Sequence, residues 1–466
     1  MKKIVIIGAG PGGYYTALCL GHADFDITLI DKEYAGGTCL NIGCIPTKVL
    51  LDHTSLFEHF QESVNKKKIF NLSGSISINP EVLRRYQLEV INQLKFGLEK
   101  LFKSKKINFI YGEASFISPK KILVVGKNDK LEIDADYIVI ATGSKPKSIP
   151  GFTFDKKLVV SSDDVWSIPI VPKKLLIVGS GPIGIEFARI FNLLGSSVTI
   201  AEIQDRMCPL LDAEISENLL RSLKRRGIAT KPNVASKFIS KENNEVKVEF
   251  LSTKDNTCEQ NTFDQVLIAI GREPNAGNLC AEKAQIDLEP HGFIKVNEYL
   301  ETNVKDVWAI GDVTNYPQLA HTASFQARVV TENILGGKKK VFDGSFIPSC
   351  IFGYPEIAFV GETEDSLKLK GKNYKAGKFL FLASGKAKAS GLTEGLVKIL
   401  MDKDTKKILG AHIIGPEASN LIHELVIAMQ NNLTVEQVTH SIHAHPTYSE
   451  VVLEALEDCL GKAVHV

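Results

Sequence analysis

Two glycine-rich turns, each placed directly after an apolar strand, limit what this chain can fold into. The runs 4–7 and 175–178 both lead into the pattern Gly-x-Gly-x-x-Gly. A helix-compatible stretch and a second strand ending in an acid follow each turn, which is the dinucleotide fingerprint in its required context. The first glycine permits the tight turn, the second lets the backbone approach a pyrophosphate, and the third lets helix and strand pack closely. These glycines are Gly8, Gly10 and Gly13 in the first turn and Gly179, Gly181 and Gly184 in the second.

The two fingerprints lie 171 residues apart (179 minus 8) and predict two dinucleotide sites in one chain, with electron transfer between two cofactors. A glycine-rich turn in an ordinary α/β sheet is the alternative interpretation of each. Asp31, which follows the strand 27–30, would accept hydrogen bonds from a ribose. Glu202 in the equivalent place favours a free 2′-hydroxyl, hence NAD over NADP. Residues 203–205 supply no cation for a 2′-phosphate, and we discount Arg206 in that role.

The order of elements predicts an α/β fold: two Rossmann-like dinucleotide-binding domains followed by a C-terminal α+β domain. At 466 residues the chain is too long for one core. Apolar strands at 138–141 and 266–270 close the two dinucleotide folds in the same way. A further strand, 307–310, delivers Asp312 to the edge of a sheet where ligands bind, although this residue could instead cap a helix. The predicted domains are 1–147 with 273–341, then 148–272, then 342–466.

Composition excludes several classes of function. The net charge of +1 gives no electrostatic case for nucleic acid or for a membrane surface. No apolar run approaches the ~18 residues of a membrane span. The first residues are interpreted as a buried strand and not as a signal peptide, because glycines interrupt them. Of eight cysteines only Cys39 and Cys44 form a tight pair, which indicates a reducing compartment, and we expect the cytoplasm.

The Cys39–Cys44 pair is the first candidate for chemistry. Two thiols this close can form a small disulfide ring if the backbone bends. So short a loop would restrict the unfolded chain little, so a redox role explains the spacing better than a stabilising one.

The second candidate lies near the C-terminus, where Glu450 could orient His445 through Nδ1 and leave Nε2 free to move a proton. A surface histidine cluster is the alternative interpretation. His440, His443 and His445 lack a completing ligand set, and His423-Glu424 lacks the second histidine of a zinc-protease helix, so no metal is expected.

Residues 36–48, GGTCLNIGCIPTK, resemble the redox-disulfide signature of the flavin-dependent pyridine nucleotide–disulfide oxidoreductases. Residues 443–450, HAHPTYSE, resemble that family's C-terminal active-site motif. The resemblance covers essentially the whole chain. It implies FAD on the first fingerprint, NAD on the second, and a C-terminal domain at a homodimer interface.

The resemblance also assigns roles to individual residues. Cys39 would be the interchange thiol that meets the substrate, and Cys44 the thiolate against the flavin. His445 would reach in from the other subunit as the base, held by Glu450. Lys48 and Glu186 would form an ion pair near the flavin and nicotinamide, and Asp312 would bind the FAD ribityl chain. The remaining cofactor-binding residues would be Thr38, Gly112, Thr142, Gly143, Gly271 and Ala320.

Within the family, residues 41–43, Glu202 and the 443–450 motif look most like members that oxidise protein-bound dihydrolipoyl groups with NAD⁺. Such members work with lipoyl domains and the acyltransferase core of 2-oxo acid dehydrogenase complexes, or in glycine cleavage. A related glutathione- or mercury-type reductase using NAD(P)H is the alternative, and a non-enzymatic scaffolding role is a second one. Departures from the family pattern at Thr47, Tyr448, Ser384, Lys386 and 321–326 affect the choice of substrate more than the chemistry.

Overall fold

The computed structural model describes residues 1–165 and 170–465. Contacts divide the chain into two compact units. The first unit contains residues 1–49, 79–147 and 271–344, and the second contains 50–78, 148–270 and 345–466. The division into three domains at the expected boundaries stays a prediction, since the second unit holds both the second dinucleotide fold and the C-terminal sheet.

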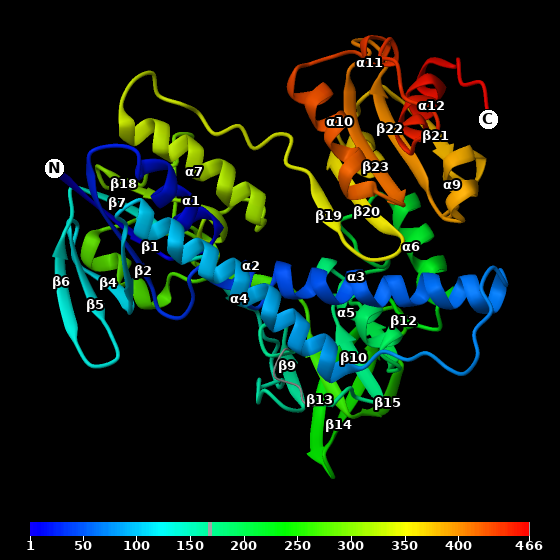
Figure 1. Cartoon of the computed structure of the whole chain (residues 1–466), viewed down its shortest axis with the longest axis horizontal. Coiled ribbons are helices and arrows are strands. Elements are labelled where there is room, and N and C mark those ends of the chain that lie inside the picture. Colours follow the sequence, from blue (N-terminus) through cyan, green and yellow to red (C-terminus); the bar gives the residue numbers. More distant parts are fainter. Residues whose placement is uncertain (166–169, 466) are drawn as a thin grey trace. The chain divides into compact units, whose positions relative to one another are not determined.

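A five-stranded parallel sheet forms the core of the first unit, in the order β18-β7-β1-β2-β3 (Figure 1). Its central strands read as apolar runs, and Ile4, Ile6 and Leu29 are fully buried. Such runs are typical of parallel strands covered on both faces. The strands are β1 (Lys2–Ile7), β2 (Phe25–Asp31), β3 (Asn108–Tyr111), β7 (Tyr137–Ile140) and β18 (Val307–Ala309).

The longest helix of the first unit begins at a side-chain cap. The Asn79 side chain accepts hydrogen bonds from the N–H groups of Glu81 and Val82 and so starts α4 at Pro80. The helices are α1 (Pro11–Leu20), α2 (Gly37–Asn41), the start of α3 (Cys44–Gln61), α4 (Pro80–Ser104), α7 (Ala320–Leu335) and the short η3 (Gly277–Leu279), η4 (Ala281–Ala284), η5 (Pro290–Gly292) and η6 (Gly311–Val313). Two small antiparallel sheets join β4 (Glu113–Ser118), β5 (Lys121–Val125) and β6 (Lys130–Asp134), and β8 (Ser144–Pro146) with β17 (Arg272–Pro274).

The second unit repeats the first parallel sheet, in the order β12-β11-β10-β16-β9. The central strand β10 pairs in parallel with β11 and β16, as β1 pairs with β2 and β7, so the predicted internal duplication is present. Its elements are β9 (Val159–Ser161), β10 (Lys174–Val178), α5 (Pro182–Leu193), β11 (Ser197–Ala201), α6 (Ala213–Arg225), β12 (Ala229–Lys231) and β16 (Gln265–Ile268). A three-stranded meander joins β13 (Val234–Glu242), β14 (Glu245–Ser252) and β15 (Cys258–Phe263), and η1 (Glu62–Lys66) extends α3.

The C-terminal part of the second unit is an antiparallel sheet, β19-β20-β23-β22-β21, packed with helices (Figure 1). Apolar side chains from β22, β23, α10 and α12 share one buried core. This α+β layer confirms the predicted fold class. Its elements are β19 (Ser349–Ile351), β20 (Glu356–Gly361), α8 (Glu364–Leu369), β21 (Tyr374–Leu380), η7 (Phe381–Ala383), α9 (Gly385–Ser390), β22 (Leu396–Asp402), β23 (Ile408–Gly415), α10 (Ala418–Gln430), α11 (Val435–Thr439) and α12 (Ser449–Leu460).

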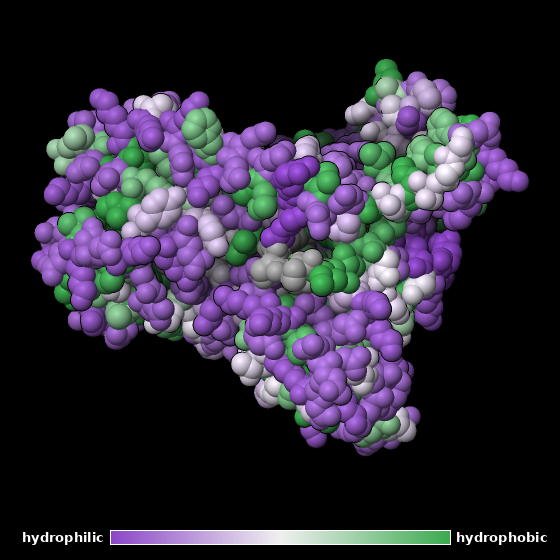
Figure 2. All heavy atoms as spheres, turned by 60° about the horizontal axis from the view of Figure 1, so that its bottom comes forward, coloured by the Kyte–Doolittle hydropathy of each residue, from purple (hydrophilic) through white to green (hydrophobic). Residues whose placement is uncertain are grey.

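Hydrophilic side chains dominate the face shown in Figure 2, with apolar residues scattered among them. Among the described residues, no helix is both long enough and apolar enough to cross a membrane.

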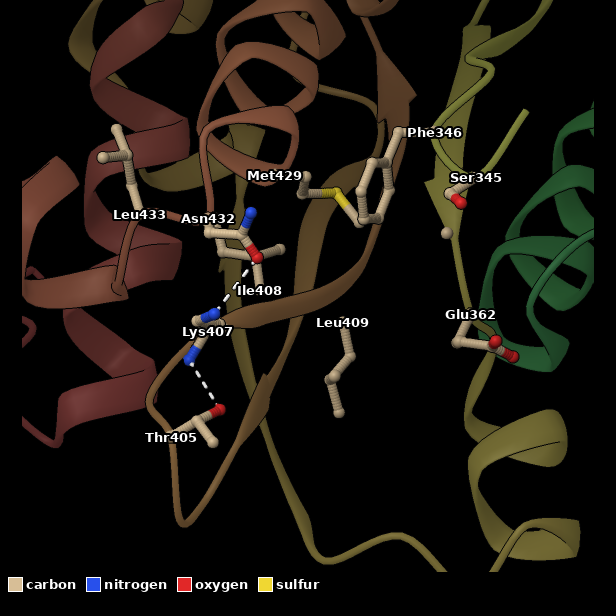
Figure 3. Close-up of a pocket in the computed structure, with 11 residues that line it drawn as sticks. Ser345, Phe346, Glu362, Thr405, Lys407, Ile408, Leu409, Met429, Asn432 and Leu433 are labelled. Carbon is tan, nitrogen blue, oxygen red and sulfur yellow. Dashed lines mark hydrogen bonds between the residues drawn. The ribbon is translucent and has the colours of Figure 1, made fainter. Parts of the chain in front are cut away.

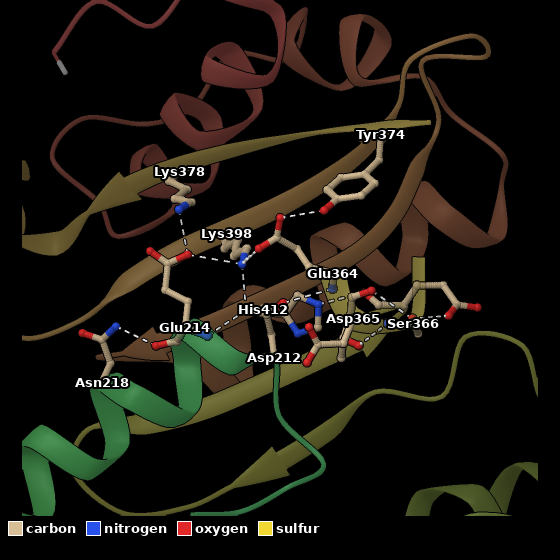
Figure 4. Close-up of polar contacts among 12 residues, drawn as sticks. Asp212, Glu214, Asn218, Glu364, Asp365, Ser366, Tyr374, Lys378, Lys398 and His412 are labelled. Atoms are coloured by element: carbon tan, nitrogen blue, oxygen red, sulfur yellow. Dashed lines mark hydrogen bonds and ion pairs between the residues drawn. The ribbon is translucent and has the colours of Figure 1, made fainter. Parts of the chain in front are cut away.

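A buried ammonium group ties α6 to the C-terminal sheet within the second unit. The Lys398 side chain on β22 is 1% exposed, and its Nζ lies 2.7 Å from Asp212 Oδ1, 3.2 Å from Glu214 Oε2 and 2.5 Å from Glu364 Oε2 (Figure 4). Burial acts against the charge of Lys398, but its hydrogen bonds to these carboxylates raise its pKa overall. Burial likewise acts to raise the pKa of Asp212, and the bond from Lys398 lowers it overall. The three carboxylates therefore surround an internal cation.

Removal of this cation should destabilise the protein strongly. Lys398→Met leaves Asp212 buried without its counter-charge, and we expect a loss of about 3–5 kcal/mol in the free energy of unfolding at neutral pH. Arg221→Met is the control, because its partner Glu217 and Arg221 are each 66% exposed, and it should cost less than about 1 kcal/mol. Denaturant titration measures both.

The same comparison has a pH dependence of known sign. The folded-state pKa of Asp212 is depressed, so its ionised form stabilises the wild type above the ordinary carboxyl pKa and this contribution is lost as the pH falls. In Lys398→Met, the Asp212 carboxyl is buried without its cation, and burial then favours its protonated form. The stability difference between the two proteins should shrink below about pH 4, and a constant difference would contradict the assignment.

Candidate redox and dinucleotide sites

The first glycine turn has the shape that a pyrophosphate requires. Gly8 has φ +102°, and a Cβ there would lie 2.1 Å from the carbonyl oxygen of Ala141. A Cβ at Gly13 would lie 1.7 Å from the oxygen of Gly8, so helix α1 and strand β1 pack as the motif predicts. At Gly10 a Cβ would meet no atom within 4 Å. The backbone is therefore closed on the protein side and open where a dinucleotide would approach.

Asp31 lies at the end of β2 and organises the loops beside this turn. Its carboxylate accepts hydrogen bonds from the N–H groups of Ala9 (2.7 Å), Glu33 (2.9 Å) and Tyr34 (2.9 Å), and its carbonyl oxygen accepts one from Gly112 (2.9 Å). Oδ1 accepts the bonds from Glu33 and Tyr34, whereas Oδ2 accepts the bond from Ala9 and has further acceptor capacity, so the position suits the ribose contact expected from the sequence.

A second part of the predicted flavin site gathers at the ends of β7 and β18. The hydroxyl oxygen of Thr142 is buried and has no hydrogen-bond partner among the described residues, and Gly143 follows with φ +70°. Ser144 donates a hydrogen bond of 2.6 Å to Asp312 Oδ2 and accepts one of 2.7 Å from Arg272 Nε. Burial raises the pKa of Asp312, although Ser144 and Arg272 act to lower it. The orphaned Thr142 hydroxyl fits a site that a polar ligand completes.

Sequence reasoning missed Gln326 on α7, the helix that begins at Ala320. This fully buried side chain accepts a hydrogen bond of 2.7 Å from the N–H of Gly311, next to Asp312. Its amide nitrogen is buried and has no partner among the described residues. The available sequence signal was a glutamine among the mostly small and apolar residues around it, and residues 321–326 had entered the prediction only as a departure from the family pattern.

The redox pair lies against the first glycine turn. A Cβ at Gly37 would lie 2.5 Å from Cα of Gly10, so α2 can approach the turn only because position 37 is glycine. Asn41 secures α2 by donating to the carbonyl oxygens of Ala35 (3.0 Å) and Gly37 (2.8 Å). Thr38 and Cys39 are carried on α2, and Cys44 and Lys48 on α3.

Cys39 and Cys44 are not joined by a disulfide, and their side chains interact through a hydrogen bond. That bond, burial and the charge of Cys44 raise the pKa of Cys39 well above its ordinary value, and Lys48 acts in the opposite direction. The two thiols therefore share a small space and interact directly.

The second glycine turn matches the first in geometry. A Cβ at Gly179 (φ +101°) would lie 2.4 Å from the carbonyl oxygen of Ala269. A Cβ at Gly184 would lie 2.2 Å from the carbonyl oxygen of Gly179, and a Cβ at Gly181 would meet no atom within 4 Å. Glu202, only 7% exposed, accepts hydrogen bonds from Ser180 N–H (2.9 Å) and Oγ (2.7 Å) and from Gln204 N–H (3.0 Å). Ser180 therefore fixes the acid that we expect to read the ribose.

Two other predicted cofactor residues have definite local settings. Glu186 is buried on α5 and accepts a hydrogen bond of 2.9 Å from the N–H of Phe352. Gly271 has φ +107° and begins the segment that returns to the first unit. Lys48 belongs to the first unit and Glu186 to the second, so their ion pair stays a prediction.

His445 and Glu450 form the expected imidazole–carboxylate pair. The distance from His445 Nδ1 to Glu450 Oε1 is 2.8 Å, and Glu450 Oε2 accepts a hydrogen bond of 2.8 Å from Thr447 N–H. Burial acts to raise the pKa of Glu450, but the bonds from Thr447 and His445 lower it overall. The His445 side chain is 78% exposed, so Nε2 is accessible to a substrate or to another subunit.

A cavity of about 480 Å³ lies elsewhere, in the C-terminal sheet of the second unit (Figure 3). Phe346, Met429 and Leu409 supply apolar walls, and Lys407 Nζ lies 3.0 Å from Asn432 Oδ1 at its side. Its lining includes none of the residues expected at the redox or cofactor sites, all of which the structure describes.

Curated relatives match over nearly the whole chain. Dihydrolipoyl dehydrogenase 2 (mitochondrial) of Arabidopsis thaliana is 38% identical over 100% of this chain and 92% of its own length. Dihydrolipoyl dehydrogenase of Trypanosoma brucei brucei is 37% identical over 99% of this chain and 97% of its own length. Leghemoglobin reductase of Vigna unguiculata is 38% identical over 97% of this chain and 87% of its own length.

Solved structures and family models agree with these relatives. The HOCl-induced flavoprotein disulfide reductase RclA of Escherichia coli, solved with Cu(II), superposes with a TM-score of 0.87 at 28% identity and covers 98% of this chain and 99% of that chain. The model of the pyridine nucleotide-disulphide oxidoreductases matches residues 2–327, and the model of their dimerisation domain matches 347–456. These matches span most of the sequence, and the chain belongs to the pyridine nucleotide-disulphide oxidoreductase family.

Proposed function

We propose that the chain is an FAD-dependent dihydrolipoyl dehydrogenase, which oxidises protein-bound dihydrolipoyl groups and reduces NAD⁺. The observation that carries the proposal is the hydrogen-bonded Cys39–Cys44 pair, held against the first glycine turn by the close approach of Gly37 to Gly10. A pair of thiols beside a dinucleotide cradle suits exchange with a dithiol substrate. The names of several curated relatives support the same activity.

The residues present fit both cofactors. The first turn, Asp31 and the orphaned Thr142 hydroxyl would hold FAD, and the second turn with Glu202 would hold NAD. When bound, FAD supplies the two-electron chemistry that reoxidises the cysteine pair with NAD⁺ as the final acceptor. Ser144 and Arg272 would keep Asp312 in place at the ribityl chain.

The cysteines carry out the exchange. A substrate thiolate attacks Cys39 of the Cys39–Cys44 disulfide, which breaks and releases Cys44 as a thiolate. The second substrate thiol then displaces Cys39 and closes the lipoyl disulfide, so two electrons have passed to the enzyme pair. In the reduced pair we place the thiolate on Cys44 and the proton on Cys39, and the raised pKa of Cys39 is consistent with this placement.

A base must ionise the substrate dithiol, because the thiolate and not the thiol attacks a disulfide. We assign this role to His445 Nε2 of the second subunit in a homodimer, with Glu450 fixing the ring through Nδ1. The match to the family's dimerisation domain supports the homodimer.

Partners and compartment follow from this activity. The dihydrolipoyl group would be presented by lipoyl domains around the acyltransferase core of a 2-oxo acid dehydrogenase complex. Of the eight cysteines in the sequence only Cys39 and Cys44 form a close pair, which suits a reducing compartment. We propose the cytoplasm, although several relatives are named as mitochondrial.

The first test is anaerobic and uses the FAD-loaded protein. Dihydrolipoamide should reduce it and produce a long-wavelength absorbance band from a thiolate beside the flavin, and NAD⁺ should then yield NADH. Cys44→Ser should abolish the band, while Cys258→Ser, which changes an exposed cysteine, should leave it unchanged. Reduction by NADPH but not by dihydrolipoamide would overturn the proposal in favour of a glutathione- or mercury-type reductase.

The Glu450 carboxylate can be tested through the two half-reactions. Glu450→Gln removes the charge that orients His445, and we expect reduction by dihydrolipoamide to slow by about 10- to 100-fold. Reduction by NADH, which does not need this base, should change less than about twofold. Glu457→Gln removes the same charge from helix α12 and is the matched control. Equal losses in both half-reactions would count against a role for Glu450 in base catalysis.

Nucleotide choice can be tested at Glu202. Glu202→Gln keeps an acceptor for Ser180 but removes the charge that opposes a 2′-phosphate. We expect the ratio of kcat/KM for NAD⁺ to that for NADP⁺ to fall by about 10- to 100-fold. Asp205→Asn, at a side chain that is 74% exposed, should leave the ratio unchanged. An unaltered ratio in Glu202→Gln would exclude this acid as the reader of the ribose.

A further inference from the structure

A second imidazole–carboxylate pair lies two residues before His445. His443 Nε2 is 2.8 Å from Glu424 Oε1 on helix α10, and His443 Nδ1 is 3.0 Å from the carbonyl oxygen of Ser441. The side chain of His443 is 7% exposed, in contrast to the 78% of His445. The two histidines of the motif therefore have opposite settings, one enclosed and one open.

Both ring nitrogens of His443 face oxygen atoms at hydrogen-bond distance. A rotation of the ring that turned its nitrogens away would lose both contacts. Because both nitrogens are engaged and the side chain is enclosed, His443 is placed to hold the loop and not to meet a substrate.

The surrounding loop explains why such an anchor is needed. Residues 440–448 connect α11 to α12, and Ile442, Ala444 and Pro446 around the anchor are exposed. His443 is the enclosed side chain in the middle of this exposed stretch, and its bond to Glu424 joins the loop to α10 in the core. The charge of His443 also acts to lower the pKa of Glu450.

We propose that His443, clamped by Glu424, is a positioning residue that fixes the 440–447 loop in the conformation from which His445 meets the dithiol. The inference rests on the proposed function for the role of His445. A base must be held within a fraction of an ångström of its working position, and misplacement by about 1 Å costs up to about 100-fold in rate. An exposed loop without an internal anchor would not hold His445 in one fixed position.

The test uses the FAD-loaded dimer and leaves His445 and Glu450 unchanged. Glu424→Ala removes the clamp and should slow reduction by dihydrolipoamide about tenfold, with reduction by NADH unchanged. Glu424→Gln retains an acceptor oxygen and should recover most of the rate. His465→Ala is the control, because His465 forms the same kind of pair with Glu454 at 2.5 Å but its side chain is 70% exposed. Unchanged dithiol kinetics in Glu424→Ala, or equal loss in both half-reactions, would overturn the proposal.

Hydrogen exchange provides a readout that does not depend on the substrate. The Thr447 amide donates to Glu450, so loosening of the loop should accelerate its exchange in Glu424→Ala and not in His465→Ala. Unchanged exchange would refute the anchor even if dihydrolipoamide proved not to be the substrate. If the wild type is not reduced by dihydrolipoamide but exchange at Thr447 does accelerate, the proposed function fails and the anchor stands.

Discussion

Backbone-to-backbone approach at the first glycine turn is the constraint on which the redox site depends. Gly8 and Gly13 let α1 pack against β1, and Gly37 lets α2 approach Gly10. A side chain at Gly37 would collide with backbone and push Cys39 away from the dinucleotide cradle. Glycine is therefore required here for proximity as much as for its conformational freedom.

The chemistry that follows is divided between electron transfer and proton transfer. Hydrogen bonding between Cys39 and Cys44 raises the pKa of Cys39, so the pair can keep one proton after reduction. When the dithiol arrives in the proposed mechanism, the two sulfurs form a disulfide, so they do not supply a base. His445 and Glu450 would meet that need in the proposed mechanism, and the exposure of His445 suits a role in another subunit.

Two polar clusters join separate elements inside the second unit. Lys398 on β22 is enclosed by carboxylates from the start of α6 and from α8, and these bonds outweigh the desolvation of its ammonium group. His443 and Glu424 join the loop before α12 to α10, and both of these residues lie in the part of the chain that matches the family's dimerisation domain.

The sequence by itself determined the duplicated dinucleotide fold, the C-terminal α+β layer and the identity of the cysteine pair, because glycine spacing and strand periodicity are local properties. The same local pattern indicated His445 with Glu450, which are five positions apart. Only the tertiary structure decided which residues from other elements form hydrogen bonds that hold the site residues in place. Gln326 reaches Gly311, Ser144 joins Arg272 to Asp312, and Glu424 clamps His443. Such partners are chosen by packing, and an isolated glutamine, serine or glutamate has no sequence pattern that reveals the contact.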